Sequence, residues 1–299
     1  MLYFVGLGLD QSLSLNALQI VQNCDHIYYE SYTSPVVNAK IEEEIGKSVE
    51  KVKRSFVEGG MKILELARNS SVALLCSGDP LVATTHQELR TRAADQGIET
   101  RVIHGSSIFS AVTGELGLHA YNVGRTVTMT RDPMQYTAYN TIFRNLLQGL
   151  HTIVLLEWDE ASSFFLSPAS AVKGLLDAEN DIRNGALNDD TLLLVVSRLG
   201  TDSTSISAVS FGEVGKTEFG NPPHTLVVPG KLHFTEREAL ASLFKKSRDS
   251  FKDNSEALFD LASLMVTKYS TKTLNALDRA KKAAALSGKS FSDVFENVE

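Results

Sequence analysis

Residues 77–86, which read Ser-Gly-Asp-Pro-Leu-Val-Ala-Thr-Thr-His, carry the densest set of chemically useful side chains in the sequence. They follow an apolar run that predicts a buried strand, and open α/β sheets bind ligands just beyond the carboxyl ends of their strands. Gly78 permits close approach of the backbone to a ligand. Asp79 offers a carboxylate that can accept a hydrogen bond from an amine or a ribose hydroxyl. The alternative interpretation is an ordinary helix cap formed by Thr84 or Thr85.

Two further segments place polar groups next to predicted strands. Residues 104–108, His-Gly-Ser-Ser-Ile, follow a strand and supply backbone amides and small hydroxyls suited to a pocket, although a serine N-cap would use the same residues. Residues 221–233 contain two prolines that precede a strand beginning at His224. His224 is therefore a candidate either for ligand contact or for a capped strand start.

The segment Gly6-Leu7-Gly8-Leu9-Asp10 ends the first predicted strand and invites comparison with dinucleotide-binding loops. The match is poor because Gln11 stands where the third glycine of G-x-G-x-x-G belongs. Glu30 lies at about the spacing of a ribose-binding acid, but that spacing is common by chance. No G-x-S-x-G, H-E-x-x-H or G-x-x-x-x-G-K-[ST] motif occurs, so acyl-enzyme hydrolysis, zinc hydrolysis and P-loop chemistry are not supported.

The composition is that of an ordinary globular protein, with 22% charged and 43% apolar residues among 299. The net charge of −7 disfavours a nucleic-acid binder, which needs Lys and Arg on phosphates. No apolar run approaches the ~18 residues of a membrane span, and the N-terminus lacks a basic leader, so we expect a cytoplasmic protein with no membrane partner. Cys24 and Cys76 lack His or Cys neighbours at ligand spacing, which predicts buried small side chains and no metal site.

The first half of the chain alternates between strand-like and helix-like segments. Apolar runs predict strands at 2–7, 27–29, 72–76 and 100–103. Helical spacing of apolar residues predicts helices at 12–23, 36–45, 60–68 and 86–95. Continuous apolar strands separated by helices indicate a parallel sheet that is covered on both faces.

The second half contains strands that lie close together in sequence, which favours antiparallel pairing and a mixed sheet. Predicted strands lie at 125–129, 152–156, 191–197, 205–209 and 224–228, and helices at 139–147 and 169–184. We therefore expect an N-terminal α/β domain over 1–115 and a C-terminal α/β domain over 116–240. Residues 241–299 predict a helical extension, because their apolar residues recur at helical spacing. Packing against the body or a dimer contact is the first interpretation of this extension, and binding of a partner is the second. Binding to a membrane surface is the third, because the polar faces are not strongly basic.

Seven motifs occur in a fixed order along residues 1–240. They are Gly6-Leu7-Gly8-Leu9, Tyr32-Thr33-Ser34, GDPLVATTH at 78–86, HGSSI at 104–108, HTIVLLEW at 151–158, SRLGTD at 197–202 and PPHTLVVPGKLH at 222–233. The set resembles the archaeal form of the diphthine synthases, the diphthamide-pathway members of the tetrapyrrole-methylase-like methyltransferases. GDPLVATTH and PPHTLVVPGKLH are the most specific segments, whereas Gly-Leu-Gly-Leu and Gly-Asp-Pro alone indicate only the wider superfamily.

The resemblance implies two α/β domains with a cofactor cleft between them, in a homodimer. It implies methyl transfer from S-adenosylmethionine to the amino group of a 3-amino-3-carboxypropyl arm on a histidine of elongation factor 2, giving diphthine and S-adenosylhomocysteine. Val82 lies in GDPLVATTH, residues 78–86, which is called the GDP segment after its Gly-Asp-Pro start. Val82 favours an end point of three methyl groups over a fourth added as an ester. Glu157 stands where an Asp often follows the strand, which is a mild departure.

The resemblance also implies the cofactor-binding residues. They are Leu9, Asp79, Val82, Ser107, Ile108, Leu156, Leu199 and His224. The apolar members are suited to enclose adenine and the thioether, and the polar members to fix orientation. No metal is expected, and no general base is assigned. Tyr32 and His86 are left outside the predicted site.

Two other functions stay open at this point. One is a methyltransferase of the same fold that acts on a corrin, a porphyrin precursor or ribosomal RNA, against which the ATTH and VVPGKLH segments and the acidic charge argue. The other is a non-catalytic protein that binds a partner. The presence of Asp79 and the other residues expected to contact the cofactor argues against this function.

Overall fold

The computed structural model describes residues 1–36, 38–254 and 258, so the predicted helical extension at 241–299 lies mostly outside the described residues. The chain forms two compact units. Unit 1 comprises Met1–Val112 together with Trp158–Phe164 and Arg198–Thr204, and unit 2 comprises the remainder. Two short segments that are distant in sequence therefore belong to the N-terminal unit.

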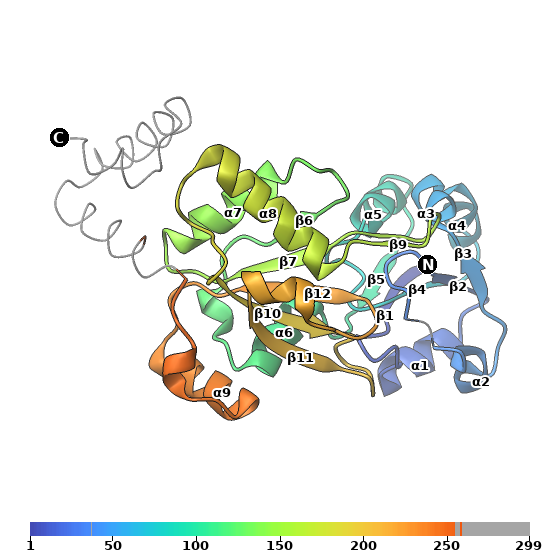
Figure 1. Cartoon of the computed structure of the whole chain (residues 1–299). Helices are drawn as coiled ribbons and strands as arrows, with labels where there is room; N and C mark the ends of the chain where they lie inside the picture. The colour runs from blue at the N-terminus through green and yellow to red at the C-terminus, as the bar shows by residue number, and fades with distance from the viewer. Residues whose placement is uncertain (37, 255–257, 259–299) are drawn as a thin grey trace, which may run out of the picture. The chain divides into compact units, whose positions relative to one another are not determined.

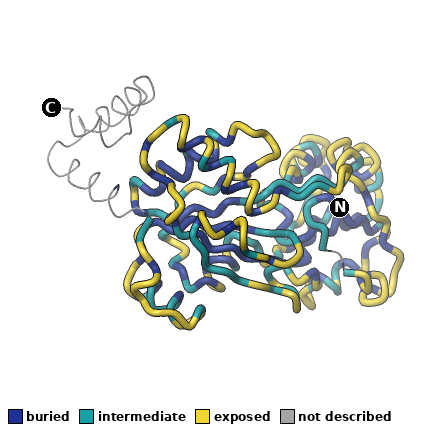
Figure 2. The backbone as a smooth tube through the Cα atoms, in the orientation of Figure 1, coloured by how far each residue is buried: buried dark blue, intermediate teal, exposed yellow. Residues whose placement is uncertain are grey.

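Unit 1 is built on a sheet of five parallel strands. In chain order these are β1 (Leu2–Gly6), β2 (His26–Glu30), β3 (Glu50–Val52), β4 (Val72–Cys76) and β5 (Thr100–Ile103). Their order across the sheet is β3-β2-β4-β1-β5. The central strands β1 and β4 are almost entirely buried, as continuous apolar runs predict for a sheet covered on both faces. The strand pairings confirm the parallel sheet (Figure 1), and Figure 2 shows how much of the backbone is buried.

Two separate apolar clusters lie on the two faces of this sheet. On one face, α1 (Leu15–Gln22) and α2 (Ile41–Ile45) contribute to the core with inward residues such as Val21. On the other face, α3 (Arg54–Gly59), α4 (Met61–Ala67) and α5 (His86–Asp95) do so with residues such as Leu89. Every crossover helix thus buries its apolar side, and the carboxyl ends of the parallel strands are left for loops.

One predicted helix is much shorter than expected. Spacing predicted a helix over 36–45, but α2 spans only Ile41–Ile45. Asn38 accounts for the late start, because its side-chain oxygen accepts the Lys40 amide at 2.9 Å and its NH2 group donates to the Gln11 carbonyl at 3.1 Å. Such a local side-chain bond competes with helix formation. The elements of this unit that were not predicted include β3, α3 and the start of α6 (Ile108–Leu116), which continues into unit 2.

Unit 2 contains a mixed five-stranded sheet, as expected. Its strands are β6 (Val127–Met129), β7 (Thr152–Leu156), β10 (Leu192–Ser197), β11 (Ser205–Ser210) and β12 (His224–Val228). Their order is β11-β10-β12-β7-β6, with β6 parallel to β7 and the other pairs antiparallel. The short strands β8 (Trp158–Asp159) and β9 (Phe164–Phe165) pair with each other, and β8 lies in the Trp158–Phe164 segment of unit 1.

The helices of unit 2 support this sheet. α7 (Tyr136–Leu146) packs against β6, β7 and α8 (Pro168–Ile182), and α9 (Phe234–Phe244) follows β12. Ser167 begins α8 by accepting the Ser170 amide, with proline in the first turn. Short 3-10 turns lie at Ala120–Asn122, Phe211–Lys216 and Arg248–Ser250. Among the described residues, no helix is both long and apolar enough to span a membrane.

Candidate functional site

Three loops of unit 1 meet at the carboxyl ends of β1, β4 and β5. The Gly8 and Gly78 backbones exchange hydrogen bonds, with Gly8 N to Gly78 O at 3.1 Å and Gly78 N to Gly8 O at 2.9 Å. A β-carbon on Gly105 would lie 2.4 Å from the Gly78 carbonyl oxygen, so the third loop fits only because this residue is glycine. These glycines bring three chain segments into backbone contact.

Asp79 is the buried carboxylate at this junction, with 7% of its surface exposed. Its Oδ1 accepts the Leu81 amide at 2.9 Å, and its Oδ2 lies 2.6 Å from Nδ1 of His104. The His104 side chain is mostly exposed. Asp79 is thus held in one orientation from within its own loop and from the neighbouring loop, which is the arrangement that a hydrogen-bonding ligand anchor requires.

The loops that carry Leu9 and Leu199 come together although 190 residues separate the two leucines in the chain. The Leu9 amide donates to the Ser106 hydroxyl at 2.9 Å. A β-carbon on Gly200, whose φ is +87°, would lie 2.7 Å from the Leu9 β-carbon. The Arg198–Thr204 segment therefore packs directly on the loop after β1, and both leucines are half-buried.

Val82, Ser107 and Ile108 complete the predicted residues in unit 1, and all three are half-buried. The Val82 amide donates to the Asp79 carbonyl at 3.2 Å, which closes the turn of the GDP segment. The Ser107 hydroxyl accepts the Phe109 amide at 3.2 Å, so the N-cap interpretation of this serine is correct as well. Six of the eight predicted residues thus lie on converging loops of one unit.

The remaining two, Leu156 and His224, belong to unit 2 and lie at the same end of its sheet. β7 and β12 pair antiparallel with Leu155 opposite Thr225, so the residues next to them are neighbours. His224 Nε2 donates to the Gly220 carbonyl at 3.2 Å, which leaves Nδ1 as an acceptor. Burial lowers the pKa of His224 and keeps the ring neutral.

Gln11 is a site residue that the sequence did not reveal. It is buried with φ of +59°, and its NH2 group donates to the Gly8 carbonyl at 3.1 Å. Its side-chain oxygen accepts from Tyr29 at 3.2 Å and from Ser77 at 2.9 Å. Gln11 thereby joins the ends of β1, β2 and β4. The sequence did hold a signal, because Gln11 stands where the third glycine of the dinucleotide motif would be.

Glu30, at the end of β2, is fully buried and was also not predicted as part of this region. Its Oε2 accepts the Tyr32 amide at 3.1 Å and the Thr33 amide at 3.0 Å. Its Oε1 has no hydrogen-bond partner among the described residues. Burial raises the pKa of Glu30 to about 7, although the Thr33 and Tyr32 bonds act in the opposite direction.

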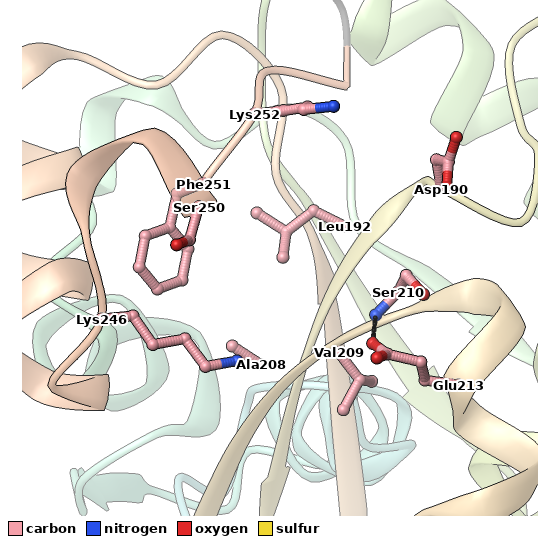
Figure 3. Close-up of a pocket in the computed structure, with 10 residues that line it drawn as sticks. All are labelled: Asp190, Leu192, Ala208, Val209, Ser210, Glu213, Lys246, Ser250, Phe251 and Lys252. Carbon is pink, nitrogen blue, oxygen red and sulfur yellow. Dashed lines mark hydrogen bonds between the residues drawn. The ribbon is translucent and has the colours of Figure 1, made fainter.

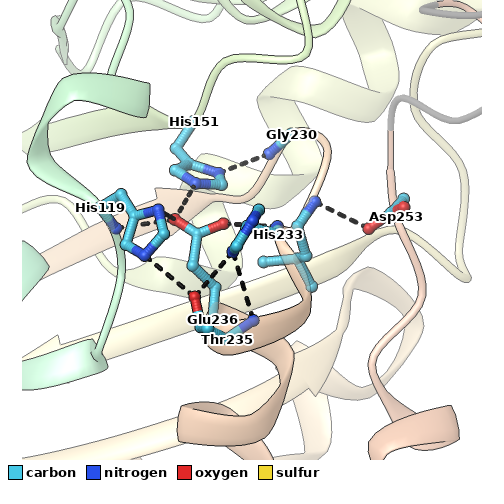
Figure 4. Close-up of polar contacts among 8 residues, drawn as sticks. His119, His151, Gly230, His233, Thr235, Glu236 and Asp253 are labelled. Carbon is cyan, nitrogen blue, oxygen red and sulfur yellow. Dashed lines mark hydrogen bonds and ion pairs between the residues drawn. The ribbon is translucent and has the colours of Figure 1, made fainter.

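A second buried carboxylate, Glu236 at the start of α9, organises a cluster in unit 2 (Figure 4). It accepts from His151 Nε2 at 3.0 Å and from the His119 and His233 amides at 2.7 Å each. His151 Nδ1 in turn accepts the Gly230 amide at 2.9 Å. Within the described residues no group of His, Cys, Asp or Glu is arranged to hold a metal ion, and this cluster serves to anchor α9.

A pocket in unit 2 lies beside β10 and β11 (Figure 3). Its lining includes charged groups of both signs, among them Asp190, Glu213, Lys246 and Lys252. None of the predicted site residues lines it. The candidate site is therefore assigned to the strand ends of unit 1 and not to this pocket.

Known proteins match most of this chain. The sequence matches the family described as Tetrapyrrole (Corrin/Porphyrin) Methylases over residues 1–214. The chain is 38% identical over 251 residues to the diphthine synthase of Methanothermobacter thermautotrophicus, covering 81% of this chain and 95% of that protein. It is 40% identical to the diphthine synthase of Methanosarcina mazei, covering 81% and 96%. A crystal structure titled diphthine synthase superposes with a TM-score of 0.75 at 33% identity, covering 83% of this chain and 98% of that one.

Proposed function

Because this chain belongs to the tetrapyrrole methylases and, within them, to the diphthine synthases, we propose that it methylates elongation factor 2. The chain is a methyltransferase that uses S-adenosylmethionine. The proposed acceptor is the amino group of a 3-amino-3-carboxypropyl arm on a histidine of the factor. The observation that carries the proposal is the convergence of the GDP, HGSSI and Gly-Leu-Gly-Leu loops on buried Asp79 in unit 1.

The residues of unit 1 fit S-adenosylmethionine. A β-carbon on Gly78 would have only the Ser106 carbonyl oxygen within 4 Å, at 3.8 Å, so there is room beside the GDP backbone. Asp79 supplies a carboxylate that accepts from a hydroxyl or an ammonium group. The apolar side chains Leu9, Val82, Ile108 and Leu199 are half-buried, as expected where an adenine ring or a thioether will cover them.

The role of the protein in this reaction is positioning. S-adenosylmethionine supplies a methyl group on a sulfonium, a good leaving group for displacement by a neutral amine. Asp79 and Ser107 orient the cofactor, and the leucines exclude water from it. Holding reacting groups in line contributes roughly 7–11 kcal/mol. The family resemblance also assigns Leu156 and His224 of unit 2 to cofactor binding, and that assignment stays a prediction. No residue is assigned as a general base.

Calorimetry with S-adenosylhomocysteine tests this site. We expect Asp79→Asn to raise the dissociation constant by about 10- to 100-fold, because a buried hydrogen bond to a charged group is lost. Asp95→Asn, an exposed aspartate at the end of α5 in the same unit, is the matched control and should bind like the wild type. Equal binding by all three proteins would place the cofactor elsewhere.

The number of methyl groups is proposed to be three, all on the amino nitrogen. Mass analysis of the modified peptide distinguishes this from a fourth group added as an ester, since mild alkali removes only the ester. A homodimer is proposed on the same resemblance. Sedimentation analysis of the pure protein tests it, and a single-chain mass at micromolar concentration would contradict it.

A further inference from the structure

Tyr32 and His86 lie in two of the sequence motifs but are not among the proposed cofactor-binding residues. Tyr32 follows β2, and His86 begins α5. Both side chains are buried in unit 1, at 6% and 0% exposure. The Tyr32 hydroxyl lies 3.2 Å from His86 Nε2, and His86 Nδ1 lies 2.8 Å from the Pro80 carbonyl oxygen. A continuous chain of hydrogen bonds thus runs from the loop after β2 into the GDP segment.

The positions of the protons in this series of hydrogen bonds follow from the groups at its two ends. A carbonyl oxygen can only accept, so His86 Nδ1 carries a proton and donates it to Pro80. Burial lowers the pKa of His86 and keeps the ring neutral, so Nε2 has a free lone pair. Tyr32 therefore donates its hydroxyl proton to Nε2. Each donor in the chain has one acceptor, and every bond is shielded from water.

The GDP segment needs this support. Ala83 has φ of +55°, a left-handed conformation that a residue with a β-carbon rarely adopts. Thr85 is at the N-cap position of α5 but makes no side-chain capping bond. Thr84 instead donates its hydroxyl to the Pro80 carbonyl at 2.8 Å. The carbonyl that His86 binds therefore lies inside a strained turn, next to Asp79 and two residues before Val82.

The other end of the chain is equally fixed. Glu30 accepts the amides of Tyr32 and Thr33 and so sets the backbone on which the tyrosine is carried. The Arg54 guanidinium lies over the Tyr32 ring, 5.2 Å from its centroid. The tyrosine is thus held by its backbone, its ring and its hydroxyl.

We propose that Tyr32 and His86 are positioning residues for methyl transfer, which hold the GDP turn in the conformation that binds S-adenosylmethionine. This inference rests on the proposed function. Neither residue is catalytic, since both are buried and act through the Pro80 carbonyl. Removing the hydrogen-bonded chain frees the turn to relax at Ala83, which moves Asp79 and Val82 away from the cofactor. Cofactor affinity is therefore expected to fall, while turnover at saturating cofactor is retained.

Tyr32→Phe is the first variant, because it keeps the ring under Arg54 and removes only the hydroxyl. We expect the KM for S-adenosylmethionine and the Kd for S-adenosylhomocysteine to rise about tenfold, the effect of one lost buried hydrogen bond. The kcat and the KM for the protein substrate should stay within about twofold of wild type. Tyr28→Phe is the matched control, since Tyr28 is buried in β2 and lies in the same apolar cluster but outside the hydrogen-bonded chain. It should leave all four constants unchanged.

His86→Asn supplies a double-mutant test. The Asn amide NH2 occupies the place of Nδ1 and keeps the bond to Pro80, while the acceptor for Tyr32 is lost. Adding Tyr32→Phe to His86→Asn should then change the Kd for S-adenosylhomocysteine by less than about twofold, because the bond is already absent. Additive effects on the Kd would overturn the proposal, as would a Tyr32→Phe protein that binds like wild type.

Two outcomes separate this inference from the proposed function. If wild-type protein fails to bind S-adenosylhomocysteine, the cofactor assignment itself is wrong. If the wild type binds and transfers methyl groups, and Tyr32→Phe loses thermal stability with no change in Kd, the hydrogen-bonded chain is purely structural. Only a coupled change in the Kd supports a positioning role.

Discussion

Glu30 in unit 1 and Glu236 in unit 2 are both fully buried carboxylic acids, yet their surroundings shift the pKa in opposite directions. Burial raises the pKa of Glu30 to about 7. Burial also acts to raise the pKa of Glu236, but hydrogen bonds from His151 and from the His119 and His233 amides lower it to about 2. Neither side chain is exposed to solvent, and the donors that reach Glu236 outweigh its burial, whereas those that reach Glu30 do not.

The difference is between a carboxylate with a purely structural role and one that lies near the proposed cofactor-binding residues. Glu236 uses both oxygens to anchor α9, and three hydrogen bonds stabilise its charge. Glu30 uses one oxygen for the turn that carries Tyr32, and the other has no partner among the described residues. Incompletely satisfied polar groups concentrate where a protein binds or transforms a ligand. Glu30 lies at the strand ends of unit 1, where the proposed cofactor residues gather.

Breaking the Glu236 cluster should have the largest effect. Glu236→Gln places an NH2 group against donors and leaves at least one of them without an acceptor. We expect the free energy of unfolding at pH 7 to fall by about 3 kcal/mol or more. Urea unfolding measures it. Glu238 is on the same helix, has a 41% exposed side chain and pairs with Arg248, so Glu238→Gln should change it by less than about 0.5 kcal/mol. Equal losses of unfolding free energy in both variants would contradict a special structural role for Glu236.

Acid should remove the stabilisation due to Glu236. Its folded pKa is depressed, so its contribution is fully present above the unfolded value near 4.5 and is lost as the pH falls to about 2. Between pH 5 and pH 2 the stability difference between wild type and Glu236→Gln should shrink by about 3 kcal/mol. A difference that stays constant over this range would show that the carboxylate is not stabilised by its donors.

Glu30 should show the reverse pH dependence. Its folded pKa is raised, so its contribution is fully present below about pH 4.5 and is lost as the pH rises through 7. The stability of wild type relative to Glu30→Gln should therefore fall by about 3 kcal/mol between pH 5 and pH 8. Urea unfolding of both proteins across this range gives the difference directly, and parallel curves would refute the raised pKa.

The smallest expected effect concerns His119. Its amide, and not its ring, makes the short bond to Glu236, because ring Nδ1 lies 3.8 Å from the carboxylate oxygen and the side chain is 27% exposed. His119→Gln keeps the amide and should cost less than about 1 kcal/mol at pH 7. Thermal unfolding of His119→Gln and Glu236→Gln under the same conditions measures the two losses of stability. A loss as large as that of Glu236→Gln would mean that the ring carries the cluster.

Much of this architecture could be predicted from sequence periodicity. The strands at 72–76, 100–103, 152–156 and 224–228 have the predicted bounds, because short apolar runs between turn residues leave little freedom. Helix α3 and the short strand β3 were not predicted, since apolar residues do not recur with a clear period in such short segments. Tertiary packing determines their conformation. Asn38 shortened α2 through side-chain bonds that apolar spacing does not register.

The site was partly predictable for a similar reason. Asp79, Val82, Ser107 and Ile108 lie directly after strands, and chain order alone brings such residues to one edge of a parallel sheet. Leu9 and Leu199 were predicted only from the family resemblance, because apolar spacing does not indicate that Gly200 packs on the distant loop after β1. Only the structure identifies Gln11, Glu30 and the hydrogen-bonded pair Tyr32–His86, since burial and donor geometry cannot be derived from residue type.

Intact-mass analysis of elongation factor 2 tests the central claim most directly. The factor carries the unmethylated 3-amino-3-carboxypropyl arm and is incubated with this protein and S-adenosylmethionine bearing a deuterated methyl group. We predict the gain of three labelled methyl groups, with Asp79→Asn slower at limiting cofactor. No labelled methyl group on the factor, while S-adenosylhomocysteine still binds the protein, would contradict the claim and assign the enzyme a different acceptor.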